Sequence, residues 1–201
     1  MNEKEALLRS SGKLYDYRKV EDNAWINLRA LLPQINSTPS PEQSRKLLEQ
    51  VIGVFPESST INTPFYADLG CHIHLGENVS INLDCLFLDE ALITIKDGAK
   101  IGPRCSFYTA IHPLDPVIRA TGLERALPIT IEENVWIGGS VVINGGVTIG
   151  KGSVIGSGSV VTHDIEPGVF AAANPCRVIR PITKEDCLKD QKEYEDYLAN
   201  A

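Results

Sequence analysis

The sequence places one of its four histidines, His112, beside a proline in the segment TAIHPLDP, residues 109–116. Imidazole has an unperturbed pKa of about 6.5, so histidine is the side chain best matched to taking a proton from a reacting hydroxyl at neutral pH. Pro113 would restrict the backbone of the histidine before it. The alternative is a solvated or turn-capping histidine, and the surrounding residues have to decide between the two.

Two other groups of residues could also do chemistry. His72 and His74 alternate in CHIHLG, so a strand would place both on one side, as a zinc site requires. Arg177 and Arg180 stand three apart in CRVIR, and planar guanidinium groups suit phosphates. The alternative for the two arginines is a structural role at the end of the fold, against a C-terminal helix.

The composition narrows the classes of function. The 201 residues are enough for one domain with a buried core, and the net charge of −7 disfavours a surface for nucleic acid. No apolar run approaches the ~20 residues that cross a bilayer. The charged start MNEKEALLRSSGK lacks the apolar core of a signal peptide, and the five cysteines form no CxxC pair. We therefore expect a cytoplasmic protein with reduced thiols and with neither nucleic acid nor a membrane as partner.

Large aliphatic residues recur every six positions in the second half of the chain. This period excludes an α-helix, which has 3.6 residues per turn, and an alternating strand. It is typical of a chain that turns a corner every six residues, so that three sides make a coil of about 18 residues. The large positions are Ile131, Ile137, Ile143, Ile149, Ile155 and Val161, and small or branched residues follow four later at Val135, Val141, Val147, Ser153 and Ser159.

The same spacing occurs earlier in the chain, with one two-residue slip. The large positions are Leu75, Ile81, Phe87, Ile95, Ile101 and Phe107, and the small ones are Val79, Cys85, Ala91, Ala99, Cys105 and Ile111. About twelve sixes make about four coils, and the pattern predicts an all-β core that is a left-handed parallel β-helix, an exception to the usual right-handed crossover. The period stops at residues 108–130, which predicts a loop inserted at one corner with His112 on it.

Both ends of the chain have the apolar spacing of helices. In SPEQSRKLLEQVIG, Ser40 and Gln43 form a capping box, Pro41 fits the first helical position and Gly53 is expected to end the helix. Thr183 is the corresponding cap near the C-terminus. The expected organisation is a helical segment over 1–57, the β-helix over 58–182 and a short helical tail over 183–201.

Four segments together resemble the hexapeptide-repeat acyltransferases, and most closely their maltose and galactoside O-acetyltransferase branch. They are INLDCLFLDE, FYTAIHPLDPVIR, the run of sixes over 128–165 and NPCRVIRPI. The resemblance covers nearly the whole chain, including SGKLYDY. It implies a homotrimer with active sites between adjacent subunits, acetyl-CoA as the co-substrate and no metal. A hydroxyl of a sugar acceptor would attack the thioester directly.

The resemblance also implies roles for individual residues. His112 would be the general base, and the N–H of Gly139 a donor to the thioester oxygen. Asp16 and Tyr17 are alternatives because the register of LYDY is open, Glu90 stands where the galactoside branch has aspartate, and His163 stands where lysine is common. The implied acceptor-binding residues are Asn82, Asp84, Asp68, Asp16, Tyr17 and Glu90, and the implied cofactor-binding residues are Gly139, Ser157, Thr162, His163, Arg177 and Arg180.

Other functions remain open from the sequence. Maltose-, glucose- and galactoside-like acceptors, a cell-wall sugar and a xenobiotic would all present a hydroxyl to the same base. Zinc-dependent carbonic anhydrases of the left-handed β-helix type are a rival class, but their typical His-x4-His spacing is absent from the four histidines. A non-catalytic β-helix scaffold is disfavoured by the loop histidine.

Overall fold

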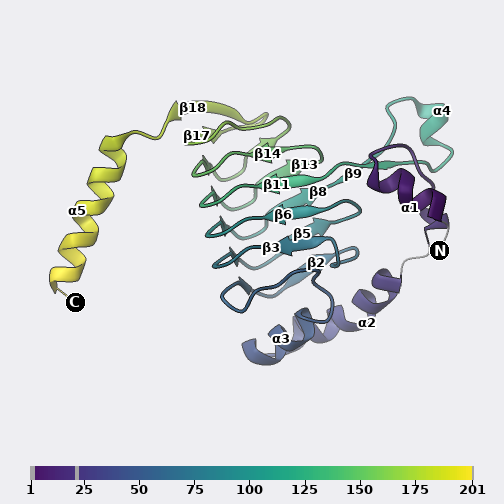
Figure 1. The fold of residues 1–201 in the computed structure, drawn as a ribbon, viewed down its shortest axis with the longest axis horizontal. Helices are drawn as coiled ribbons and strands as arrows, with labels where there is room; N and C mark the ends of the chain where they lie inside the picture. Colours follow the sequence, from purple (N-terminus) through teal and green to yellow (C-terminus); the bar gives the residue numbers. More distant parts are fainter. Residues whose placement is uncertain (1–2, 21–22, 201) are drawn as a thin grey trace.

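The computed structural model describes residues 3–20 and 23–200, and its centre is a solenoid of stacked coils (Figure 1). Helices α2 (Asn23–Ser37) and α3 (Pro41–Leu48) lie at the end where the first coils begin, and α1 (Glu3–Ser10) lies to one side. Helix α5 (Lys184–Asn200) extends away on the opposite side. Residues 1–2, 21–22 and 201 belong to the flanks that we expected to be helical and are outside the described residues.

Each full coil contributes one strand to each of three sheets. Among the described strands of these three sheets, all pairs are parallel except β17 and β18, which run antiparallel. The seven-stranded sheet runs β1 (Thr60–Ile61), β4 (Ser80–Ile81), β7 (Lys100–Ile101), β12 (Trp136–Ile137), β15 (Val154–Ile155), β17 (Val169–Ala172), β18 (Arg177–Pro181). The five-stranded sheet contains β2 (Phe65–Ala67), β5 (Cys85–Leu88), β8 (Ser106–Tyr108), β13 (Val142–Asn144) and β16 (Val160–Val161). The four-stranded sheet contains β3 (Ile73–Leu75), β6 (Ile93–Ile95), β11 (Ile129–Ile131) and β14 (Thr148–Ile149).

The register of the strands reproduces the period of the sequence. Ile137 lies opposite Ile155, an offset of 155 − 137 = 18 residues. Ile81 lies opposite Ile101, an offset of 20, which absorbs the two-residue slip. The prediction of a parallel β-helix of hexapeptide repeats is confirmed. The first coil, formed by β1, β2 and β3, begins at Thr60, ahead of the first large repeat position, Leu75.

The interior of the solenoid is a column of apolar side chains. The six large residues predicted from Ile131 to Val161 are all at 0% exposure. The ring of Phe87 lies between two others: it stacks on Phe107 with a centroid distance of 4.6 Å and is tilted by 35° against Phe65 at 5.5 Å. Two expected members of the small-residue column, Ala91 and Ile111, are only half-buried because the chain leaves the repeat beside them.

Helices α2 and α3 cover the open end of this core. Leu28, Ile35 and Leu48 belong to the same apolar cluster as the first coil, and the Asn36 carboxamide exchanges two hydrogen bonds with the backbone of Phe65 (2.8 and 2.9 Å). Half of the predicted capping box forms: the Ser40 hydroxyl accepts from the Gln43 N–H at 3.3 Å. The Gln43 side chain accepts from the Thr38 hydroxyl instead of returning to residue 40.

The expectation that Gly53 ends this helix is wrong. Helix α3 ends at Leu48, and the N–H of Gly53 donates to the carbonyl of Gly70 at 3.2 Å. A Cβ at residue 53 would collide with the carbonyl of Cys71, so glycine is needed there for the close approach of two backbones.

The inserted loop is an arm that has its own structure. We call residues 109–128 the arm; it contains β9 (Ala110–Ile111), helix α4 (Pro116–Arg119) and β10 (Arg125–Ala126), which pairs antiparallel with β9. The Asp115 carboxylate caps α4 by accepting from the N–H of Val117 at 2.8 Å. The tip is apolar and open: Leu114 is 94% exposed and Val117 76%.

Helix α5 begins with the predicted cap. The Thr183 hydroxyl accepts from the Asp186 N–H at 3.4 Å, and the Asp186 carboxylate accepts from the Thr183 N–H at 2.8 Å. No residue of α5 is buried. Among the described residues, no helix combines the length and the apolarity that crossing a membrane requires.

Candidate active site

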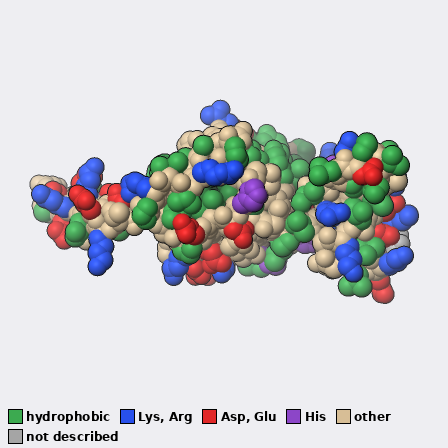
Figure 2. All heavy atoms as spheres, turned by 90° about the horizontal axis from the view of Figure 1, so that it is seen from above, with side chains coloured by type: hydrophobic (Ala, Val, Ile, Leu, Met, Phe, Trp, Pro, Cys, Tyr) green, Lys and Arg blue, Asp and Glu red, His purple; other side chains and the backbone are tan. Residues whose placement is uncertain are grey.

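A pocket of about 780 Å³ lies where the solenoid and the arm meet helix α2 and residues 3–20, which we call the N-terminal segment. In the space-filling view, hydrophobic side chains gather where the solenoid joins the lobe that contains the arm (Figure 2). Four of the residues predicted for catalysis or acceptor binding line this pocket: His112, Asp68, Glu90 and Tyr17. The structure therefore brings together a candidate base and candidate acceptor-binding groups from four separate segments of the chain.

The topology explains why three of these residues meet. Every coil runs from the seven-stranded sheet through the five-stranded sheet to the four-stranded sheet. Asp68 follows β2, Glu90 follows β5, and the arm with His112 follows β8, so all three leave the same sheet at the same corner of successive coils. Stacked corners in a parallel β-helix place such residues one above another.

Asp68 and Glu90 form an acidic pair in the pocket. Burial, a side-chain hydrogen bond with Asp68 and the charge of Asp68 raise the pKa of Glu90 to about 8. The Thr109 hydroxyl lies 3.4 Å from a Glu90 carboxyl oxygen. At neutral pH, Glu90 is therefore mostly protonated and can donate a hydrogen bond to the Asp68 side chain.

A buried carboxyl group fixes one wall of the pocket from behind. Asp89 is fully buried and accepts backbone N–H bonds from Leu69 at 2.8 Å, Asp68 at 3.2 Å and His72 at 3.3 Å. The His72 ring lies with Nδ1 2.7 Å from the Asp89 carbonyl. Burial raises the pKa of Asp89. These bonds fix Asp68 and Leu69 relative to Glu90, the neighbour of Asp89 in the chain.

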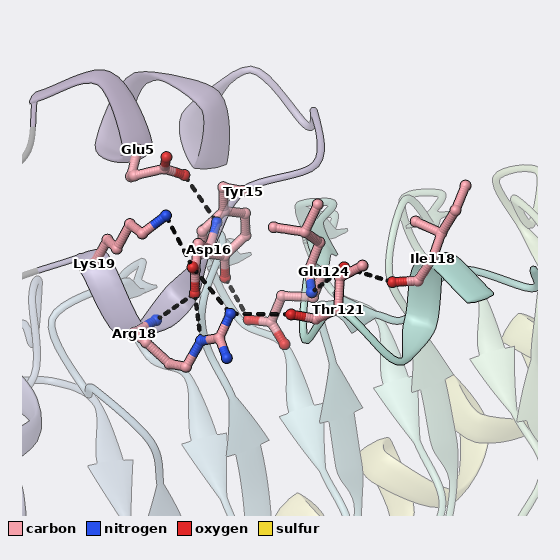
Figure 3. Close-up of polar contacts among 9 residues, drawn as sticks. Glu5, Tyr15, Asp16, Arg18, Lys19, Ile118, Thr121 and Glu124 are labelled. Carbon is pink, nitrogen blue, oxygen red and sulfur yellow. Dashed lines mark hydrogen bonds and ion pairs between the residues drawn. The ribbon is translucent and has the colours of Figure 1, made fainter. Parts of the chain in front are cut away.

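The opposite wall is held by contacts between the N-terminal segment and the arm (Figure 3). The Tyr15 hydroxyl donates to Glu124 at 2.6 Å, and the backbones of Tyr15 and Glu124 exchange two hydrogen bonds of 2.8 and 3.1 Å. The Arg18 guanidinium donates to the carbonyl of Thr121 at 3.0 Å. Burial, with the bond to Glu124, raises the pKa of Tyr15 strongly. Tyr15, Glu124 and the arm thus form one side of the pocket.

The two candidate residues of LYDY occupy different positions. Tyr17 begins the 3₁₀ turn η1 (Tyr17–Lys19) and lines the pocket. Asp16 caps that turn, its carboxylate binds Arg18 at 2.7 Å and Lys19 at 3.2 Å, and it is not part of the pocket lining. Hydrogen bonds from Arg18 lower the pKa of Asp16 to about 2. Of the two candidates, Tyr17 therefore lines the pocket and Asp16 does not, and a role for either in acceptor binding stays a prediction.

Four other predicted residues lie at a different corner of the coils. Asn82 and Asp84 follow β4, Gly139 follows β12 and Ser157 follows β15, so all four stand between the seven- and five-stranded sheets. The Asn82 side chain accepts from the N–H of Leu83 at 2.8 Å. The Gly139 N–H donates to the Ser157 hydroxyl at 3.1 Å. Within one chain, this column does not join the pocket.

The remaining predicted cofactor residues lie beyond the arm. Thr162 and His163 follow β16, on the same corner column as the pocket but later in the solenoid, and the Thr162 hydroxyl lies 2.9 Å from His163 Nδ1. Arg177 and Arg180 are exposed on β18. Arg180 binds the carboxylate of Asp186 through two bonds of 2.7 and 3.0 Å, so that part of its side chain already has an anionic partner.

In the described part of the chain, the two alternating histidines belong to no group of metal ligands. Within residues 3–20 and 23–200, no three His, Cys, Asp or Glu side chains come together as metal ligands. His72 contacts Asp89, and His74 forms a backbone bridge with Val54.

Several pocket residues were not foreseen from the sequence. Tyr15, Trp25, Ile26, Arg9 and Glu124 line the pocket as well. Trp25 lies on α2 with the Arg29 guanidinium 4.7 Å from its ring centroid. In the sequence, Trp25 is one apolar residue of an ordinary amphipathic helix pattern. Its exposure, and hence its place at the pocket, can be recognised only once the fold is known.

Comparisons with known proteins agree with this architecture. Residues 128–163 match the family model described as bacterial transferase hexapeptide (six repeats). A maltose O-acetyltransferase from Clostridium difficile 630 superposes with a TM-score of 0.86 and is 39% identical, covering 90% of this chain and 98% of that one. A galactoside acetyltransferase in complex with coenzyme A has a TM-score of 0.86 and 36% identity, covering 90% and 92%.

A hexapeptide-repeat acetyltransferase from Vibrio cholerae O1 biovar eltor, complexed with acetyl coenzyme A, has a TM-score of 0.84 and 35% identity, covering 90% of this chain and 99% of that one. The chain therefore belongs to the hexapeptide-repeat acyltransferases. Within that family, it is similar over nine-tenths of its length to the maltose and galactoside acetyltransferases.

Proposed function

We propose that the chain is an acetyl-CoA-dependent O-acetyltransferase that acts on a sugar hydroxyl, with His112 as the general base. The observation that carries this proposal is the position of His112 at a pocket of about 780 Å³ whose other walls carry Asp68, Glu90 and Tyr17. Hydroxyl, carboxyl and aromatic groups around a pocket of this size suit a polyhydroxylated acceptor. The fold neighbours that act on maltose and galactosides support the same class.

The reaction that follows is a direct transfer. The imidazole of His112 accepts the proton of the acceptor hydroxyl as its oxygen attacks the carbonyl carbon of the thioester. The carbon–sulfur bond then breaks, and the leaving thiolate takes the proton from the imidazolium. Acetyl-CoA and the alcohol become an acetyl ester and CoA thiol, with no acetyl group held by the protein.

The burial of the two cysteines in the solenoid core, Cys85 and Cys105, supports direct transfer. Cys85 and Cys105 are fully buried and donate their thiols to backbone carbonyls, Cys85 to Gly102 at 3.3 Å and Cys105 to Gly138 at 3.1 Å. A hydrogen bond with Cys105 and burial raise the pKa of Cys85, which disfavours its thiolate. None of the five cysteines forms a disulfide, which fits the cytoplasmic location that we propose.

We also propose a homotrimer in which a neighbouring copy completes each site. The column with Asn82, Gly139 and Ser157 is not part of the pocket within one chain, so these residues could share a site with His112 only if a neighbouring subunit brought the two together. The apolar arm tip, with Leu114 at 94% exposure, is a surface that such a copy would cover. Sedimentation that shows a stable monomer at micromolar concentration would contradict this assembly.

For the cofactor, we propose that Arg177 and Arg180 contact CoA phosphates, as planar guanidinium groups do. Because Arg180 already binds Asp186, phosphate would have to share or displace that carboxylate. Replacing both arginines with Gln should raise the KM for acetyl-CoA much more than the KM for the acceptor. An unchanged KM with unchanged salt dependence would make both arginines structural.

The experiment that tests the function is an acceptor screen with purified protein and acetyl-CoA, following release of CoA thiol. Maltose, glucose and galactosides form the first set, and cell-wall sugars and hydroxylated xenobiotics form the second. Thiol release that depends on a first-set sugar, with an acetyl ester found by NMR, supports the proposal. Ester formation with second-set acceptors alone would replace the acceptor class, and no release with any acceptor would contradict O-acetyl transfer.

A further inference from the structure

We propose that the acceptor carries a cationic amino group beside the hydroxyl that is acetylated, as an amino sugar does, and that Asp68 and Glu90 bind this group. The proposal rests on the proposed function, because it assigns the acceptor class of the same pocket. It concerns recognition within the pocket and adds no new chemical step to the transfer.

The first argument is the balance of charge in the pocket. Among the described residues, its lining contains three carboxyl groups, those of Asp68, Glu90 and Glu124, and one guanidinium, that of Arg9. Glu124 already accepts a hydrogen bond from the phenol of Tyr15. The cations of η1 do not compensate Asp68 or Glu90, since Arg18 and Lys19 both bind Asp16, which lies outside the lining. Within the part of the chain that the structure describes, the lining therefore carries more carboxyl groups than cations, and two of those carboxyl groups, Asp68 and Glu90, are half-buried.

The second argument is the contact between Asp68 and Glu90. Both side chains are half-buried, and the hydrogen bond to Asp68 together with burial raises the pKa of Glu90 to about 8, so that Glu90 holds a proton at neutral pH. An ammonium group can replace that proton, because it carries a full positive charge and three N–H donors for the two carboxylates. A neutral hydroxyl brings no charge and leaves the proton of Glu90 in place.

The third argument is chemical selectivity. A free amine is a stronger nucleophile than a hydroxyl and would compete for the acetyl group. An amino group held between two carboxylates stays protonated and has no lone pair for attack. His112, on the arm, would then deprotonate the neighbouring hydroxyl, and the acetyl group would form an ester. Apolar side chains of Leu69, Ile26 and Trp25 in the same lining supply surface for the carbon face of a sugar ring.

The test compares acceptors that differ only in this group: glucosamine, glucose and N-acetylglucosamine, with galactosamine and galactose as a second set. The expected result is a kcat/KM for the amino sugars on the order of tenfold or more above their neutral partners, with an ester product. In the variant Glu90→Gln or Asp68→Asn, the ratio of amino to neutral sugar should fall toward one. Glu57→Gln, at an exposed acid outside the pocket, is the matched control and should keep the parent ratio.

A binding measurement separates this inference from the function. At a pH of about 6.5, a sugar amine and Glu90 both hold protons, so binding of glucosamine should release close to one proton, measured by calorimetry in buffers of different ionisation enthalpy. Among the described lining residues, other groups could also titrate: Asp68, Glu124, Tyr15, Tyr17, Arg9 and His112. If the proton release on glucosamine binding is lost in Glu90→Gln, the released proton comes from the acidic pair.

Each outcome decides one of the two proposals. Equal transfer to amino and neutral sugars would overturn the inference and leave O-acetyl transfer standing. An amide product would overturn the inference, because the amine would then be the nucleophile. If no sugar is acetylated, the proposed function fails and calorimetry alone decides: proton-linked binding of glucosamine supports the amine site, and binding equal to that of glucose overturns it.

Discussion

The solenoid and the arm-side wall of the pocket are built on different principles. In the solenoid, one apolar residue per side of each coil points inward, and parallel strands repeat the same contact at offsets of 18 or 20 residues. The wall is built from single contacts between distant segments, such as the 2.6 Å bond between Tyr15 and Glu124, which are 109 residues apart. The core is therefore redundant, whereas each contact of the wall occurs once.

This difference predicts how substitutions act in the two regions. A change at a large repeat position of the solenoid should cost free energy of unfolding and leave the chemistry intact, because the described pocket lining includes none of these positions. A change in the wall or at the acidic pair should alter turnover, acceptor binding or pH dependence with a smaller effect on global unfolding.

The largest effect is expected at the arm. His112→Ala should lower turnover by ~10²–10⁴-fold, the usual contribution of a general base, because no other group then takes the hydroxyl proton. The KM for acetyl-CoA should change little, and the unfolding midpoint should stay near that of the parent, since the side chain is exposed. Steady-state kinetics checks this; activity within threefold of the parent would exclude His112 as the base.

Next comes the centre of the aromatic stack. Phe87→Ala should cost ~3–5 kcal/mol of unfolding free energy, because Phe87 is fully buried between two rings and the coils cannot close the cavity. Denaturant titration measures the loss. Phe170→Ala, at a half-buried ring on β17, is the control and should cost clearly less. Equal losses of unfolding free energy at the two sites would show that the aromatic stack contributes no more to stability than a half-buried ring does.

The acidic pair should give the protein a stability that depends on pH. The pKa of Glu90 rises from 4.5 when unfolded to about 8 when folded, so the folded state holds the extra proton between these values. Unfolding free energy should therefore fall as pH rises from about 4.5 to about 8, on the order of 2–3 kcal/mol after allowance for solvent at the open pocket. In Glu90→Gln this decline should be reduced, as measured by denaturant titration across the range; an unchanged slope would remove Glu90 from this role.

The smallest effect is expected at the contact between the N-terminal segment and the arm. Tyr15→Phe removes the phenol that Glu124 accepts from and should destabilise this region by about 1–2 kcal/mol. Hydrogen exchange should rise at residues 121–126 and stay at the parent rate in the coils. Tyr194→Phe, at an exposed ring on α5, is the matched control. Uniformly faster exchange throughout the chain would mean that the wall and the solenoid unfold together.

The sequence predicted the solenoid well because its information is periodic. The six-residue spacing alone predicts that residues such as Ile137 and Ile143 point inward. The interruption of that spacing predicts the position of the arm. The pocket wall was less accessible, since nothing in the local sequence pairs Tyr15 with Glu124 or directs Trp25 toward a cavity. The positions of Asp16 and Tyr17 relative to the pocket depend on a single 3₁₀ turn, and the role of Gly53 depends on a backbone that passes beside it.

The arm interrupts the chain without disturbing the lattice. Lys100 and Trp136 are 36 residues apart, yet they pair in the same register as strands separated by a single coil. Because the insertion leaves and re-enters at one corner, its length and sequence can change at a cost in loop entropy that grows only slowly with length. During evolution, acceptor preference can thus change through substitutions and insertions in the arm and the N-terminal segment, while the coils that hold the arm in place stay the same.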